Sequence, residues 1–403
     1  MKILFADAIP ESFIEILRER GDECVVSPNL GAEDLPETIG GFDVLVVRST
    51  RVTAEAIDRS DNLGLIVRSG AGTNTIDCQA AADAGIYVCN VPGTNSVAVA
   101  ELALGLLLAV DRHIPAATAD LRAGVWNKKA YSNSDGLLGK TFGVVGVGEI
   151  GLAAAERARA FGMTVVAERK ADRRPDVEAR IRAIGIRLVE DLDTLIAESD
   201  VISIHLPGGA DTENLVDADF LEKMRPGAVL INTSRGEVVD EVALLAAMDT
   251  KGIRAGLDVF RDEPGSGTGE FTSALASHPN VVGTHHIGAS TQQAQDATSA
   301  GTIEVIEAYR IGDPVNCVNV ARTRVGSTTI TIRHFDRVGV LASALEVLRQ
   351  AHINVQTMEN KVFQGSNAAM AVIDVAGEVS HEVRDQLSGL ENVIQVQTTS
   401  REQ

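Results

Sequence analysis

Short aliphatic runs alternate with helical segments along the chain as far as about Arg310, and this alternation limits the fold more than any other feature. Helical segments such as 153–161 and 241–248 separate many of the runs. Such alternation is typical of βαβ units, whose parallel strands are buried on both faces and therefore read as continuous apolar runs. The runs that predict strands are 3–6, 44–47, 65–67, 142–145, 164–167, 201–204, 229–231, 255–259 and 281–282. We therefore expect an α/β protein.

The predicted strands divide into two groups, which indicate two Rossmann-like domains with doubly wound parallel sheets. The Pro92-Gly93 turn and a long apolar helix from about Val97 lie between the groups. A second turn-rich point at His286-Ile287-Gly288 precedes another helix, so we expect the chain to return to the domain in which it began. The sequence thus predicts a discontinuous first domain over 1–95 and 287–321, and a second domain over 96–286.

The pattern changes after Gly312-Asp313-Pro314. From there a strand, a helix, two strands, a helix and a strand follow one another, which is the order of a small ferredoxin-like domain. These elements are expected at 328–333, 340–351, 355–362, 368–375, 381–390 and 393–398. We therefore predict a third, βαββαβ domain over 322–403.

Charge and cysteine spacing exclude several classes of function. The formal net charge is −20, whereas a protein that binds nucleic acid needs a basic surface. The most apolar stretch, 97–110, contains Glu101 and is too short to span a bilayer. The four cysteines lie far apart without a CxxC pair, which argues against a zinc site or a disulfide framework and fits a reducing cytoplasm. We expect a cytoplasmic protein with no metal site, no nucleic-acid partner and no membrane partner.

A glycine motif follows the predicted strand at 142–145. Gly146, Gly148 and Gly151 form G-x-G-x-x-G in front of an Ala-rich helix, with Glu149 and Ile150 inside the same loop. Such glycines permit a tight turn and a close approach of the backbone to a pyrophosphate, and the helix N-terminus offers free N–H groups. The motif therefore predicts a dinucleotide site. The alternative is a glycine turn that only packs the helix on the strand.

The next predicted strand ends at Glu168-Arg169-Lys170, where the adenosine ribose of a dinucleotide would lie. Glu168 can accept hydrogen bonds from the ribose hydroxyls, which favours NAD. Arg169 can bind a 2′-phosphate, which favours NADP. The basic cluster can also be an ordinary solvated surface run. We expect NAD and leave NADP open.

Polar side chains follow three later strands, and ligands of open α/β sheets bind beyond the carboxyl ends of strands. Arg235 follows 229–231, Glu263 follows 255–259, and His285 and His286 follow 281–282. A guanidinium can bind a carboxylate through two hydrogen bonds, and an imidazole can exchange a proton near neutral pH. A carboxylate beside the imidazole raises its pKa. Each residue alone has an ordinary explanation as a surface or loop residue, but the set predicts catalysis on a small acid.

Two basic segments follow strands of the first predicted domain. Glycines there let backbone N–H groups approach an anion, and the arginines add positive charge to an acidic protein. The segments therefore predict an anionic small molecule as ligand, although ion pairing with neighbouring acids would also explain them. The residues expected to bind it are Arg48, Ser49, Arg68, Ser69, Gly70, Ala71 and Gly72.

Taken together, these motifs resemble the D-2-hydroxyacid dehydrogenase family over nearly the whole chain. The segments that carry the resemblance are 47–53, 68–72, 90–96, 146–151, 231–236, 257–264 and 285–291. The resemblance implies that Arg235 orients the substrate, and that His286 is the general acid and base paired with Glu263. It also implies that Thr233 and Asp258 contact the cofactor.

Two positions depart from the pattern of that family. His285 stands where the family usually has proline, so His286 is the match for the catalytic histidine. Arg169 stands where the usual ribose-binding aspartate is expected, and the cofactor is therefore open. The likeness is greatest to members that oxidise 3-phospho-D-glycerate to 3-phosphohydroxypyruvate, the first step of L-serine biosynthesis. Alternatives are an NADP-dependent glyoxylate or hydroxypyruvate reductase, another D-2-hydroxyacid dehydrogenase, and a dinucleotide-binding sensor or corepressor without catalysis.

The C-terminal segment resembles an ACT domain, which is a regulatory module for small ligands. Segments 334–341 and 353–355 carry this resemblance. It implies that L-serine is an effector bound by His334, Asp336 and Asn354, which we expect at the same end of the domain. The family resemblance also implies a homodimer or a homotetramer.

Overall fold

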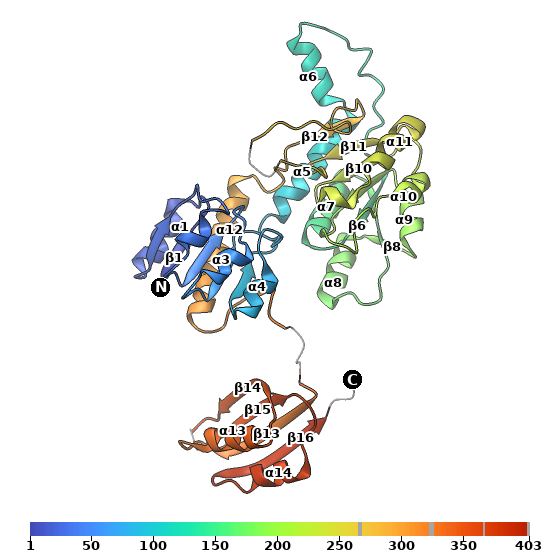
Figure 1. Ribbon diagram of the computed structural model, residues 1–403. Coiled ribbons are helices and arrows are strands. Elements are labelled where there is room, and N and C mark those ends of the chain that lie inside the picture. The colour runs from blue at the N-terminus through green and yellow to red at the C-terminus, as the bar shows by residue number, and fades with distance from the viewer. Residues whose placement is uncertain (265–267, 322–325, 366, 401–403) are drawn as a thin grey trace. The chain divides into compact units, whose positions relative to one another are not determined.

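The computed structural model describes residues 1–264, 268–321, 326–365 and 367–400. Its contacts divide the chain into two compact units, Met1–Asn319 and Val320–Gln403. The first unit holds two parallel sheets accompanied by helices, and the second holds an antiparallel sheet (Figure 1). Among the helices that the structure describes, none combines the length and the apolar character that crossing a bilayer requires.

The N-terminal sheet has the strand order β2-β1-β3-β4-β5, and all its pairings are parallel. Its strands are β1 (Lys2–Phe5), β2 (Glu23–Val26), β3 (Val44–Val47), β4 (Leu65–Arg68) and β5 (Tyr87–Asn90). The helices α1 (Glu11–Glu19), α2 (Leu35–Thr38), α3 (Ala54–Asp58), α4 (Cys78–Asp83) and α12 (Gln292–Arg310) accompany it. Ile3 and Leu4 enter two separate apolar clusters, because successive side chains of a strand point to opposite faces. Helix α12 packs against β4 and β5, so the chain returns to this sheet late in the sequence.

The second sheet is also parallel, with the order β12-β11-β10-β9-β6-β7-β8. Its strands are β6 (Thr141–Val145), β7 (Thr164–Glu168), β8 (Arg187–Val189), β9 (Val201–Ile204), β10 (Val229–Asn232), β11 (Arg254–Leu257) and β12 (Val281–Gly283). The helices of this part are α5 (Ser96–Asp111), α6 (Ile114–Arg122), α7 (Glu149–Ala160), α8 (Pro175–Ile184), α9 (Leu192–Glu198), α10 (Ala218–Lys223), the 3-10 helix η1 (Gly236–Val238) and α11 (Glu241–Lys251). The strand order reverses its direction at β6, and ligands of such sheets bind beyond the carboxyl ends of the strands at this reversal.

The C-terminal unit has the order strand, helix, strand, strand, helix, strand. Its elements are β13 (Thr328–Phe335), α13 (Val340–Gln350), β14 (Val355–Val362), β15 (Ala368–Val375), α14 (His381–Ser388) and β16 (Val393–Ser400). The strand order is β14-β15-β13-β16, and every pairing is antiparallel. Ile330, Ile332 and Ile373 of the sheet pack with Leu348 of α13 and Leu387 of α14 in one buried cluster.

The structure confirms the parallel sheets and the C-terminal βαββαβ order, but several elements were missed. Each aliphatic run of the sequence overlaps a strand, and the C-terminal elements lie close to the expected ranges. The missed strands β2, β5 and β8 all lie at sheet edges. Helix α6 was also missed. The predicted boundaries at 95/96 and 286/287 fall inside the first unit and stay predictions, and 322–325 lie outside the described residues.

Candidate active site

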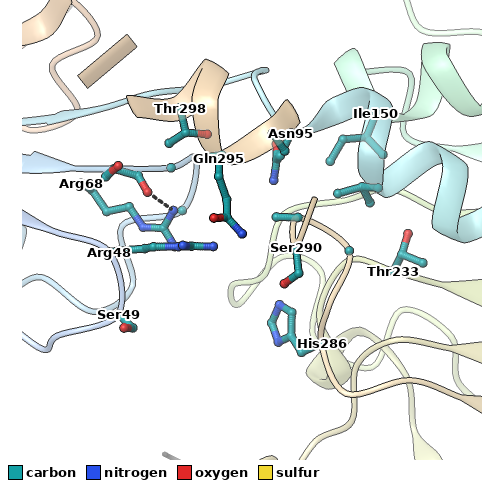
Figure 2. A pocket seen from close by; sticks show the side chains of 18 of the residues that line it. Arg48, Ser49, Arg68, Asn95, Ile150, Thr233, His286, Ser290, Gln295 and Thr298 are labelled. Carbon is teal, nitrogen blue, oxygen red and sulfur yellow. Dashed lines mark hydrogen bonds between the residues drawn. The ribbon is translucent and has the colours of Figure 1, made fainter. Parts of the chain in front are cut away.

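A cavity of about 490 Å³ lies where residues beyond the carboxyl ends of strands from both parallel sheets meet (Figure 2). This volume is within the range of small-molecule sites, about 300–1,000 Å³. The predicted site residues that line it are Arg48, Ser49, Arg68, Ser69, Gly70, Ala71, Gly72, Ile150, Thr233, Arg235, Asp258 and His286. The predicted residues that are not part of the lining are Gly146, Gly148, Glu149, Gly151, Glu168, Arg169 and Glu263.

The predicted histidine–carboxylate pair is formed. Nδ1 of His286 lies 2.7 Å from Oε2 of Glu263, and Oε1 of Glu263 accepts the backbone N–H of Phe260 at 2.9 Å. The hydrogen bond to Glu263 raises the pKa of His286, although burial acts against it. Burial alone would raise the pKa of Glu263, but its hydrogen bonds with His286 and Phe260 lower it. With Nδ1 engaged, Nε2 is the ring nitrogen left to exchange a proton with a ligand.

Asp258 fixes the loop that carries this histidine. Its buried carboxylate accepts the Thr284 hydroxyl at 2.6 Å and the backbone N–H groups of Ile287 and Gly288 at 2.9 and 2.8 Å. Its backbone carbonyl accepts the N–H of His286 at 2.8 Å. His286 has φ 52°, a left-handed conformation that is strained for a residue with a side chain and recurs at functional sites. Asp258 therefore positions His286 and also lines the cavity beside it.

Arg235 lines the same cavity, at the point where β10 leads into η1. Its Nη1 donates to the carbonyl of Ser234 at 2.7 Å, and Asn232 holds its backbone carbonyl at 2.9 Å. A methyl group added at Gly72 would come within 2.7 Å of Nη2 of Arg235, so the guanidinium reaches the loop that follows β4. Residues from both sheets thus converge on one position.

Arg48 and Arg68 bring two more guanidinium groups to the same cavity, as Figure 2 shows. Burial, and then the positive charges of Arg235 and Arg48, lower the pKa of Arg68. Among the described residues Nε of Arg68 is buried without a hydrogen-bond partner. Three like charges in one partly buried cavity repel one another, so an anionic ligand would relieve the repulsion.

The backbone N–H groups that follow β3 are bound by a side chain of the protein itself. The side chain of Asp7, which follows β1, accepts the N–H groups of Arg48, Ser49 and Thr50 at 2.6, 3.0 and 3.0 Å. It also accepts the Ser49 hydroxyl at 2.5 Å. The anion held by this loop is therefore a carboxylate of the protein itself. An external anion must rely on the arginine side chains and on the loop after β4.

The glycine loop has the geometry that a dinucleotide requires. Gly146 has φ 98°, and a Cβ there would collide with the backbone carbonyl of His205. A Cβ at Gly151 would collide with the carbonyl of Gly146, so this glycine lets α7 pack close to the loop. Gly148 caps α7 without a side chain, which leaves the helix N-terminus open to a pyrophosphate. The exposed Glu149 instead pairs with Arg180 at 2.7 Å.

Two side chains at the end of β7, Glu168 and Arg169, favour different cofactors. The Glu168 carboxylate forms an ion pair with Lys170 at 3.5 Å, and its backbone carbonyl accepts a hydrogen bond from Arg173. The backbone N–H of Arg169 donates to the carbonyl of Val189 at 2.8 Å, while its side chain is exposed. An acidic and a basic side chain therefore both stand where the ribose would lie.

Sequence reasoning missed other residues of the cavity. His205 follows β9, so the rule of strand ends could have found it; burial lowers its pKa to about 4, and it hydrogen-bonds with Ser203 at 2.8 Å. Gln295 and Thr298 lie one turn apart on α12 and carry no local signal, because only the returning chain brings them here. Figure 2 shows Gln295 between Arg48 and the side of the cavity that holds His286.

The effector residues predicted in the C-terminal unit do not share one end of the sheet, which corrects the prediction. His334 is buried and hydrogen-bonds with the carbonyl of Phe335 at 2.8 Å and the side chain of Asn360 at 3.1 Å. Asp336 follows the same strand, β13. Asn354 precedes β14, and β13 and β14 run in the same direction because both are antiparallel to β15. Asn354 therefore lies at the start of the strands and Asp336 at their end.

Comparisons with known proteins agree with this geometry. Residues 104–288 match the model of the family described as "D-isomer specific 2-hydroxyacid dehydrogenase, NAD binding domain". A hydroxypyruvate reductase of Thermotoga maritima is 42% identical over 74% of this chain and 95% of its own length. A D-3-phosphoglycerate dehydrogenase of Methanocaldococcus jannaschii is 39% identical over 81% of this chain, which spans only 61% of that relative.

Solved structures give the same result for the first unit. An acyclic imino acid reductase, determined in complex with NADPH and D-Arg, matches with a TM-score of 0.69 and 32% identity over 79% of this chain and 100% of that chain. A protein of Thermus thermophilus matches over the same shares of the two chains, with a TM-score of 0.69 and 34% identity. The chain belongs to the D-isomer specific 2-hydroxyacid dehydrogenase family.

Proposed function

We propose that the protein oxidises 3-phospho-D-glycerate to 3-phosphohydroxypyruvate, the first step of L-serine biosynthesis. The observation that carries this proposal is the convergence of three arginines, Arg48, Arg68 and Arg235, on one cavity with the His286–Glu263 pair. A substrate with a phosphate and a carboxylate supplies an anion at each end of such a cavity. Relatives named D-3-phosphoglycerate dehydrogenase, including that of Methanocaldococcus jannaschii, support the choice.

Each of these residues has a separate role in the proposed reaction. Arg235 binds the carboxylate and the C2 oxygen, which fixes C2 in place. Nε2 of His286 takes the proton of the C2 hydroxyl, and Glu263 stabilises the imidazolium that results. The Gly146–Gly151 loop would hold a nicotinamide cofactor, which would supply the acceptor for the hydride of C2. In the opposite direction the protonated His286 returns its proton to the oxygen.

We infer that NAD is the preferred cofactor. Glu168 at the end of β7 can accept the ribose hydroxyls and would repel a 2′-phosphate, whereas the exposed Arg169 would attract one. We expect kcat/KM for NAD to exceed that for NADP when both are assayed with a panel of D-2-hydroxyacids, of which 3-phospho-D-glycerate should be the best. A higher kcat/KM with NADP would reverse the cofactor assignment.

A glyoxylate or hydroxypyruvate reductase is the second candidate. The observation that favours it is the hydroxypyruvate reductase of Thermotoga maritima, which this chain covers almost completely. The same panel separates the candidates, because a reductase of this kind would act on unphosphorylated acids at least as well as on the phosphorylated one. A sensor or corepressor without catalysis is disfavoured, because Arg235, Glu263 and His286 are all present.

Arg48 gives a more specific test of the phosphate. In Arg48→Ala we expect KM for 3-phospho-D-glycerate to rise about 10-fold or more, because a charge-assisted hydrogen bond contributes about 1.5–3 kcal/mol. KM for D-glycerate should change little. Arg51→Ala is a matched control, since Arg51 is exposed and is not part of the cavity lining. An equal rise for both substrates would show that Arg48 does not bind the phosphate.

We further propose that the C-terminal unit is an ACT-like regulatory domain that binds L-serine near Asp336. Asn354 of the same copy would not contact this L-serine. Calorimetry with L-serine, on the full chain and on a chain ending after Val320, tests this assignment.

We also propose that the protein is a homodimer or a homotetramer. Exposed apolar side chains on and after α6, such as Leu121 and Trp126 with 59% and 81% exposed, support a contact between copies. The cytoplasmic location stays a prediction.

A further inference from the structure

Two cysteines that are distant in the sequence face each other at the edge of the N-terminal sheet. The segment around Cys317 lies beside β5, where the backbone N–H of Asn90 donates to Asn316 at 3.2 Å and that of Val318 donates to Val88 at 2.8 Å. Between these two hydrogen bonds, Cys89 and Cys317 form an antiparallel bridge. Their sulfur atoms are 3.0 Å apart, and both thiols are free.

The backbone of this pair suits a disulfide. The two hydrogen bonds flank the cysteines rather than join them, so Cys89 and Cys317 are a non-hydrogen-bonded antiparallel pair. The Cα atoms of such pairs are about 4.5 Å apart, and disulfides form at Cα separations of about 4.4–6.8 Å. The sulfur atoms need only approach by about 1 Å to reach the bond length of about 2.05 Å.

We propose that Cys89 and Cys317 are a dithiol site that closes to a disulfide when the protein meets a low-molecular-weight disulfide such as oxidised glutathione. This proposal does not depend on the proposed function. The two remaining cysteines, Cys24 and Cys78, are partly buried and serve as internal controls.

The two thiols would react in a fixed order. Cys89 is fully buried, and burial followed by the neighbouring Cys317 thiol raises its pKa, so it is a poor first nucleophile. Cys317 is partly exposed, so its thiolate attacks one sulfur of the small disulfide and releases the first small thiol. Cys89 then gives up its proton, attacks the sulfur of Cys317 and releases the second small thiol. The protein loses two electrons and two protons, and the small disulfide is reduced to two thiols.

The disulfide would fasten the end of the first unit to its sheet. Asn319, the last residue of that unit, already holds β5 through its side chain, which accepts the N–H of Val88 at 2.9 Å and donates to Ile86 at 2.7 Å. A covalent bond at Cys317 adds to these contacts and closes a very long loop of the chain. Closing a loop removes conformations from the unfolded state, so the oxidised protein should unfold at a higher temperature.

The test is oxidation of the full chain with oxidised glutathione, followed by alkylation, digestion and mass spectrometry. We expect a peptide pair joined through Cys89 and Cys317 and lighter by two hydrogens, while Cys24 and Cys78 remain alkylated. The melting temperature should rise by about 3–8 °C on oxidation. Cys317→Ser should abolish both changes, and Cys78→Ser should preserve them.

Other results would overturn the proposal. One is a product in which glutathione stays attached to Cys317. Another is alkylation of both thiols at every ratio of oxidised to reduced glutathione. The third is a disulfide between two copies of the chain. A joined peptide pair without a rise in melting temperature would overturn the fastening role. The decisive variant is Cys317→Ser, because Cys317 is partly exposed whereas Cys89 is buried.

Discussion

His286→Ala is expected to lower kcat by about 10²–10⁴-fold, which is the range for loss of a general acid and base. The reason is the geometry of the pair, in which Glu263 holds Nδ1 at 2.7 Å and leaves Nε2 for the substrate. Without the imidazole, the group that is proposed to take the proton of the C2 hydroxyl is missing. Steady-state oxidation of 3-phospho-D-glycerate by the purified variant measures the effect.

His285 supplies the matched control for this experiment. It is exposed and adjacent in sequence, but it is not part of the cavity lining. His285→Ala should keep kcat within about 3-fold of the parent, because a surface substitution away from the site has little effect. Circular dichroism and melting curves of both variants establish that they are folded. A near-normal kcat for His286→Ala would exclude this histidine as the acid and base.

Arg235→Ala is expected to lower kcat/KM by about 10²–10³-fold. Removal of one partner of a buried, hydrogen-bonded charge pair costs about 2–5 kcal/mol, and the substrate carboxylate would lose this partner. The loss should appear in both kcat and KM, because in the proposed reaction Arg235 both binds the acid and orients C2 toward the cofactor. Arg235→Lys should recover only part of the activity, since an ammonium cannot form two parallel hydrogen bonds with a carboxylate.

Arg225→Ala controls for the loss of an arginine from the same part of the chain. Arg225 pairs with Asp200 at 3.2 Å and lies outside the cavity lining. Its removal should leave kcat/KM within about 3-fold of the parent. If Arg235→Ala were no more damaging than Arg225→Ala, Arg235 would not bind the substrate.

Much of the fold and site was predictable because the signals are local. Parallel strands buried on both faces appear as apolar runs, and Arg235, Glu263 and His286 stand directly behind three of them. The glycine loop also carries its own signal, because a Cβ at Gly146 or Gly151 would collide with backbone atoms.

Features that depend on distant segments were not predictable. Gln295 enters the cavity only because α12 returns to the first sheet, and Cys317 meets Cys89 for the same reason. Nothing in the sequence indicates that Asp7 binds the backbone N–H groups of the segment that follows β3. The position of Asn354 depends on the direction of β14, which is fixed by pairing with β15 and not by the residues near Asn354.

The pH dependence of kcat/KM for oxidation, in the parent protein and in Glu263→Gln, tests the catalytic pair most directly. His286 must be neutral to accept a proton, and its hydrogen bond with Glu263 raises its pKa, so the parent should gain activity with rising pH through a pKa above the ordinary histidine value. Glutamine removes the negative charge that favours imidazolium, so the acidic limb of Glu263→Gln should move to lower pH. Coincident acidic limbs in the two proteins would contradict the assignment of His286 and Glu263 as the proton-transferring pair.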